Sequence, residues 1–134
     1  MIKTTGGAAV QRTVWKGWVE MGGKKMYLKS KWEKNYCLYL NFLKGQRMIK
    51  DFWYEPETFW FKGIKRGTNN YKPDFLVLHN NDCREHIEVK GWMDDKSKTK
   101  IKRMAKYHPN ITLRIVDKEF FKKNKNLKPL LKWE

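Results

Sequence analysis

The stretch that decides the fold is Tyr71–Trp92, YKPDFLVLHNNDCREHIEVKGW. Two apolar runs flank a polar segment, residues 79–83, that is made of turn-forming residues. This pattern predicts a β-hairpin. A turn centred on Asn81 places Asp74 opposite Glu88, with about 5 Å between their Cβ atoms. Lys90 lies two residues beyond Glu88 and therefore shares its strand face.

Two carboxylates that oppose each other across a strand pair destabilise it unless a cation lies between them. A hard divalent metal with oxygen ligands is the natural cation for such a pair, and a lysine beside it suits phosphate chemistry. These residues favour a metal-dependent nuclease. The sequence contains no Ser-His-Asp or Cys-His arrangement and no glycine-rich phosphate loop.

The order of these residues also carries a resemblance. Pro73-Asp74 followed by Glu88-Val89-Lys90 resembles the PD-(D/E)XK nuclease superfamily. A longer pattern resembles phage junction-resolving enzymes of the endonuclease I type. It comprises Ser30 and Glu33 on a helix, then residues 71–75, then residues 88–91 before a basic helix. The chain is also similar to a group of small phage proteins from about Gly17 to Asp117.

The resemblance implies a restriction-endonuclease-like core, which is a mixed α/β (α+β) fold with a central mixed sheet flanked by helices. It implies that the catalytic residues are Glu33, Asp74, Glu88 and Lys90. The implied metal is Mg²⁺ or Mn²⁺, held by Asp74, Glu88, the Val89 carbonyl and Glu33, the last directly or through a second metal. Lys90 would orient or deprotonate the attacking water, and in-line attack on a phosphodiester would leave a 5′-phosphate.

Glu33 has two interpretations. Ser30 and Glu33 form a capping box, in which the glutamate side chain reaches back to the Ser30 amide. Glu33 also lies at the border of the apolar stripe of its helix, where its side chain can point along the edge of the core. The two roles are compatible, because they use different lone pairs.

A formal net charge of +16 indicates a polyanionic partner, and nucleic acid is favoured over membrane. The expected DNA contacts are Lys65, Arg66, Lys96, Lys98, Lys100 and Arg103. Junction resolution needs two active sites, which implies a homodimer. The alternatives are a nuclease of the same fold that cuts flaps, mismatches or duplex DNA, and a DNA-binding module without activity. Some of the 20 aromatic residues could stack on exposed bases.

The chain divides into a flexible arm (1–12), a nuclease domain (13–117) and a basic tail (118–134) that docks as a short helix, binds DNA or contacts a second subunit. Expected elements are a hairpin over residues 14–28, a helix from Ser30 to Gly45, strand-like residues 50–62 broken near Pro56, a helix from Asp94 to His108, and a strand over residues 111–116.

The remaining residues of interest have simpler expected roles. Glu55 and Glu57 are expected to face solvent as partners of lysines, and His86 is expected to oppose Leu76 rather than to bind metal. Cys37 and Cys83 are expected to be reduced thiols. No segment resembles a signal peptide or a membrane span, so the expected location is the cytoplasm, that of the host cell if the gene belongs to a phage.

Overall fold

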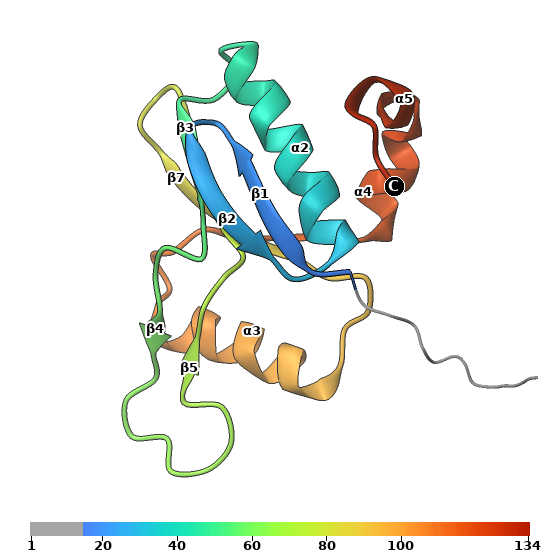
Figure 1. Cartoon of the computed structure of the whole chain (residues 1–134). Helices are drawn as coiled ribbons and strands as arrows, with labels where there is room; N and C mark the ends of the chain where they lie inside the picture. Colours follow the sequence, from blue (N-terminus) through green and yellow to red (C-terminus); the bar gives the residue numbers. More distant parts are fainter. Residues whose placement is uncertain (1–14) are drawn as a thin grey trace, which may run out of the picture.

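A computed structural model describes residues 15–134 (Figure 1). The expected flexible arm, residues 1–12, lies outside the described residues. The elements are a hairpin, a four-stranded sheet with one long helix packed against it, a smaller group formed by a strand pair and a second helix, and a short helical C-terminal segment.

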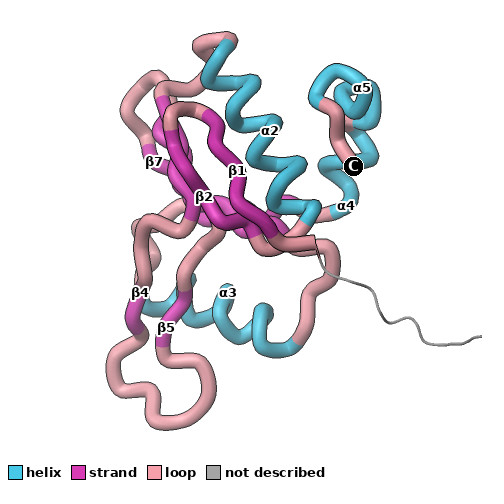
Figure 2. Tube along the Cα trace, in the orientation of Figure 1, coloured by secondary structure: helices cyan, strands magenta, loops and turns pink. Residues whose placement is uncertain are grey.

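The central sheet has the strand order β3-β6-β7-β8, formed by Asp51–Tyr54, Phe75–Leu78, Arg84–Val89 and Leu113–Val116. β6 and β7 are the hairpin predicted from the sequence, and the predicted register is confirmed, with Leu76 opposite His86. β3 runs antiparallel to β6, whereas β8 runs parallel to β7. The predicted central mixed sheet flanked by helices is therefore confirmed (Figure 2).

A separate hairpin, β1 (Gly17–Met21) and β2 (Lys24–Leu28), lies beside the sheet. Its turn is Gly22-Gly23, with φ of 63° and 77°, a left-handed conformation that glycine adopts without strain. The expected hairpin over residues 14–28 is thus present in the described part of the chain.

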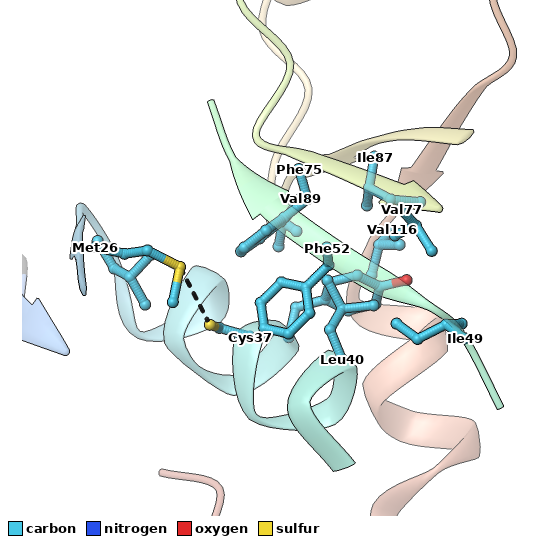
Figure 3. Packing of buried hydrophobic residues seen from close by; sticks show 12 residues of the cluster. Met26, Cys37, Leu40, Ile49, Phe52, Phe75, Val77, Ile87, Val89 and Val116 are labelled. Atoms are coloured by element: carbon cyan, nitrogen blue, oxygen red, sulfur yellow. Dashed lines mark hydrogen bonds between the residues drawn. The ribbon is translucent and has the colours of Figure 1, made fainter. Parts of the chain in front are cut away.

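The long helix α2 (Lys31–Gly45) joins this hairpin to the sheet. Buried residues of β2, α2 and the sheet form one apolar cluster, in which Phe52 and Phe75 are fully buried (Figure 3). Cys37 lies within it, with its Sγ atom 4.0 Å from Sδ of Met26. Burial of these residues fixes the α2 N-terminus relative to the ends of β6 and β7.

A smaller cluster holds the remaining strand pair, β4 (Phe59–Trp60) with β5 (Asn70–Tyr71), against α3 (Asp95–Tyr107). Asp94 caps α3, since its side chain accepts from Ser97 N, and His108 ends the helix as expected. The spacing of apolar residues in this helix predicts a buried stripe of Ile101, Met104, Ala105 and His108, and this prediction was partly wrong. Met104 is buried, but Ala105 is exposed, and Ser97 takes an inward position.

The basic tail docks on α2 as the short helices α4 (Lys118–Lys123) and α5 (Lys128–Leu131), joined by a 3-10 turn, η1 (Lys125–Leu127). The Phe120 ring packs edge-on against Tyr36 and Tyr39 of α2, with ring centroids 5.3 and 5.0 Å apart. Leu131 and Trp133 are buried. Of the three roles considered for this segment, docking is observed.

None of the helices in residues 15–134 is both long enough and apolar enough to cross a membrane.

Candidate active site

The candidate site lies where β6 begins and β7 ends. Asp74 directly precedes β6, and Glu88 is the second-last residue of β7. Their neighbours Phe75 and Val89 point into the core beside α2 (Figure 3). Continuing the observed register by one residue sets Asp74 opposite Glu88, as predicted. Both carboxylates are buried, at 7% and 8% exposure.

The Asp74 carboxylate is held by one hydrogen bond. The Val89 N–H donates to its Oδ2 at 2.8 Å, and within residues 15–134 no hydrogen bond engages Oδ1. Burial, followed by the negative charges of Glu88 and Glu33, raises the pKa of Asp74 well above its ordinary value. Asp74 therefore has a free oxygen and an excess of nearby negative charge.

Glu88 is held from two sides. The Tyr71 hydroxyl donates to Oε1 at 2.6 Å, and Lys90 Nζ lies 3.9 Å from Oε2. Burial raises the pKa of Glu88, although the Tyr71 hydrogen bond and the positive charges of Lys90 and Lys100 oppose that shift. Lys100 also lies 5.7 Å from the centre of the Tyr71 ring. The Glu88 carboxylate is thus fixed in position, with the positively charged side chains of Lys90 and Lys100 near it.

Glu33 is in the first turn of α2 and faces the same region. The predicted N-cap is observed, since Glu33 N donates to the Ser30 hydroxyl at 3.1 Å. The second half of the expected capping box was wrong. The Glu33 carboxylate accepts from Lys29 N, at 2.9 Å, rather than from Ser30 N. The Tyr54 hydroxyl donates to the same atom, Oε1, at 2.8 Å.

Within residues 15–134, no three His, Cys, Asp or Glu side chains are placed to hold one metal ion together. In this arrangement Glu33 is therefore a neighbour of the Asp74–Glu88 pair, joined to it through space by its charge. The two buried carboxylates still fit a divalent cation. Both have raised pKa values, and Asp74 has an oxygen without a partner in the described chain. Main-chain oxygen and water would complete the ligand set.

The other two acidic residues considered from the sequence, Glu55 and Glu57, have different partners. Glu55 pairs with Lys29, at 3.1 Å, as expected, but its side chain is only 19% exposed and does not face solvent as predicted. Its backbone N–H donates to the Asp74 carbonyl at 2.7 Å, which ties it to the site. Glu57 was expected to pair with a lysine, and this was wrong. It contacts Nε2 of the buried His86 at 2.9 Å.

The basic residues expected to bind DNA lie on two adjoining segments. Lys96 and Lys98 are exposed on α3, and Lys65 and Arg66 are exposed on the loop before β5. Arg103, by contrast, makes a contact within the protein, since its guanidinium donates to the Thr68 carbonyl. A groove of about 610 Å³ separates the two segments. Its lining is residues 67–70 together with Asp95, Lys96, Thr99, Lys100 and Arg103.

Lys100 connects this groove to the acid pair. It lines the groove, and it also lines a small crevice with Tyr71 and Glu88. Lys100 therefore places a positive charge between the groove and Glu88.

Sequence reasoning assigned no role to Tyr54 or Tyr71, whose hydroxyls hold Glu33 and Glu88. Tyr71 belongs to the YKPDF pattern, so its position beside the acid pair could have been suspected. Tyr54 gave no such signal, because its contact depends on how α2 packs against β3. Of the aromatic residues, Trp18, Tyr27, Trp60 and Trp92 are exposed within the described chain. Trp18 and Tyr27 pair edge-on across β1 and β2 at 5.3 Å.

The fold and site together define a mixed α/β domain with a buried acid pair next to a basic groove. A family model matches residues 19–127, and the chain belongs to that family, described as protein of unknown function (DUF1064). A search of curated proteins gave no match.

Proposed function

We propose that this protein is a metal-dependent DNA endonuclease of the PD-(D/E)XK type, and that its substrate is a four-way DNA junction cut by a homodimer. The observation that carries the nuclease proposal is the buried Asp74–Glu88 pair with Lys90 beside it, together with a basic groove whose lining residue Lys100 also lies next to Glu88.

The residues would divide the chemistry as follows. Asp74 and Glu88 would hold Mg²⁺ or Mn²⁺, which when bound polarises a phosphate oxygen and acidifies water. Val89 supplies the N–H that orients Asp74, and Tyr71 orients Glu88. Lys90, at the edge of the pair, is placed to orient the attacking water and to stabilise negative charge that develops on the phosphate.

The basic surface would bind the DNA backbone. Phosphate contacts come from Lys96, Lys98 and Lys100 of α3, and from Lys65 and Arg66 of the neighbouring loop. Arg103 would act indirectly by holding that loop through Thr68. Contacts of this kind give affinity without sequence preference, so the choice of substrate must come from the shape of the DNA.

The four-way junction is supported by the resemblance of the ordered residues Ser30, Glu33, residues 71–75 and residues 88–91 to phage junction-resolving enzymes. A dimer follows from the need to cut two symmetry-related strands. The second candidate is a nuclease of the same type that acts on flaps, mismatches or duplex DNA. A third is a DNA-binding module without cleavage, which the presence of Glu33, Asp74, Glu88 and Lys90 together argues against.

The deciding experiment measures cleavage of a four-way junction, a flap and a linear duplex of the same sequence with Mg²⁺ present. We expect paired incisions in the junction at a rate at least about tenfold above that for the duplex. Equal rates on all three would remove the junction proposal and keep the nuclease. Binding without cleavage of any of them, also with Mn²⁺, would favour the binding module.

A further inference from the structure

A second binding site is suggested by a pocket of about 440 Å³ between the start of α2 and the C-terminal segment. It is separate from the groove beside α3, since the two share no lining residue. Its volume falls within the range of about 300–1,000 Å³ that is typical of ligand pockets. Nothing in the proposed mechanism uses it.

The walls of this pocket are aromatic. Trp32, Phe121 and Trp133 line it, and the Phe121 ring lies edge-on to both tryptophans, with ring centroids 5.0 and 5.2 Å apart. The indole Nε1–H of Trp133 is buried and has no hydrogen-bond partner among the described residues. An unpaired buried donor is uncommon and calls for a specific explanation.

The rim of the pocket is basic. Four exposed lysines from three consecutive short helices line it: Lys118, Lys122, Lys125 and Lys128. Glu134 is the one acidic residue in the lining, and it is paired with Lys34 at 3.6 Å. Flat apolar walls with a positive rim match a ligand with a flat ring and a phosphate, which is the chemistry of a nucleotide.

The pocket also adjoins the candidate active site through Trp32. A side chain placed at Gly91 would lie 3.4 Å from the Trp32 ring, so the backbone directly after Lys90 packs against that tryptophan. A DNA strand that passes Lys90 would therefore reach Trp32 and the lysine rim within a short distance.

We propose that this pocket binds an unpaired nucleotide of the substrate strand, with its base against the aromatic walls and its phosphate at the lysine rim. The inference rests on the proposed nuclease function and adds a substrate class to it, namely DNA with single-stranded or unstacked nucleotides next to the cut. Fully paired duplex would leave the pocket empty.

The test compares two double variants that remove the same charge from the same segment. Lys122→Gln with Lys125→Gln changes the rim, whereas Lys123→Gln with Lys132→Gln changes exposed lysines that do not line the pocket. Binding of a short single-stranded oligonucleotide and of a matched blunt duplex is measured at fixed salt with a chelator present. Under these conditions the result does not depend on metal or cleavage.

We expect the rim variant to lose about tenfold or more in affinity for the single strand, while its duplex affinity falls only as much as that of the control variant. Equal losses in the two variants would show general electrostatic attraction and overturn the proposal. Phe121→Leu, checked for folding by thermal unfolding, should also weaken single-strand binding, because base stacking on an aromatic ring is removed.

The two proposals fail separately. If the wild-type protein cuts no DNA but the rim variant selectively loses single-strand binding, the nuclease proposal fails and the nucleotide pocket stands. If the protein cuts DNA and the rim variant behaves as the control does, only the pocket proposal fails.

Discussion

Asp74 and Glu88 show why a site can be costly to the fold that contains it. Both carboxylates are buried next to each other, and burial raises the pKa of each. In the absence of a cation, ionising them therefore works against folding. The hydrogen bonds from Val89 N and the Tyr71 hydroxyl offset part of this cost and fix the direction of each carboxylate.

This cost gives a stability prediction for Asp74→Asn. Because the pKa of Asp74 is raised in the folded state, its stabilising contribution is complete below the ordinary carboxyl pKa of about 4 and is lost as the pH rises through the folded value. The asparagine amide oxygen can still accept from Val89 N. We expect the variant to be more stable than wild type at pH 7–8, by about 1 kcal/mol or more, with the difference disappearing near pH 4.

Thermal unfolding between pH 4 and 8 with a chelator measures this effect. The exposed Asp82, whose partner is Lys50, provides the control Asp82→Asn, which should not show that pH trend. A destabilised Asp74→Asn variant at pH 7 would mean that the carboxylate is structural and would contradict a cation site at Asp74 and Glu88.

Glu33→Gln tests whether the charge of Glu33 or only its hydrogen bonds matter. A glutamine Oε1 can accept from both Tyr54 and Lys29, so stability should change little. If the charge assists catalysis, single-turnover cleavage should fall by about 10²-fold, comparable to the loss of one transition-state interaction of ~2.7 kcal/mol.

Ser30→Ala is the matched control. It should cost about 1 kcal/mol of stability through the missing N-cap and leave cleavage intact. A Glu33→Gln protein that cuts at the wild-type rate would remove Glu33 from the site.

At the level of elements, features that depend on local sequence could be predicted, whereas most contacts between distant segments could not. The β6–β7 register followed from the position of the turn, and the N-cap at Ser30 followed from its spacing to Glu33. The partners of the Glu33 carboxylate did not follow, because Lys29 N lies one residue before the expected capping box and Tyr54 reaches Glu33 only through the packing of α2 against β3. The Glu57–His86 contact was not predicted either, because, like the Tyr54–Glu33 contact, it joins residues far apart in sequence.

The helix α3 illustrates a further limit. Its charge pattern predicted a basic face, and Lys96 and Lys98 are exposed. However, helical periodicity could not show which lysine and arginine side chains are available to bind DNA. Arg103 donates to the Thr68 carbonyl, and Lys100, although it lines the groove, is only partly exposed and lies over the Tyr71 ring. The exposed basic surface is therefore narrower than the sequence indicated, and a test of DNA binding must avoid the residues that hold the fold.

The salt dependence of DNA binding can be predicted on that basis. Replacing Lys96 and Lys98 with glutamine should reduce the slope of log K against log[salt] by about 0.9 for each phosphate that is no longer neutralised, and so by about 2 for the pair. Fluorescence anisotropy of a labelled duplex at several salt concentrations measures this slope. The control changes Lys24 and Lys44, which pair with Asp51, and should leave the slope unchanged. The same slope in wild type and the α3 variant would make this face an ordinary solvated surface.

For the whole molecule, the net positive charge and the buried acid pair have opposite effects on an approaching phosphate group. A formal charge of +16 attracts polyanions, yet the candidate site presents two carboxylates to any phosphate that reaches it. A bound divalent cation would remove that conflict. It would also favour folding, since a ligand that binds only the folded state stabilises it by mass action.

We therefore expect Mg²⁺ or Mn²⁺ to raise the melting temperature of the wild-type protein in a concentration-dependent manner. The gain should approach about 2.7 kcal/mol at 100 times the dissociation constant, which is roughly 10 °C for a domain of this size.

Unspecific salt effects are removed by matching the ionic strength with NaCl. Asp74→Asn and Glu88→Gln should abolish the gain, whereas Glu57→Gln, which alters the carboxylate beside His86, should retain it. The effect should increase from pH 5 to pH 8, because the raised pKa values of Asp74 and Glu88 make protons compete with the metal at lower pH. A gain of equal size in wild type and in both site variants would place the cation elsewhere on the protein.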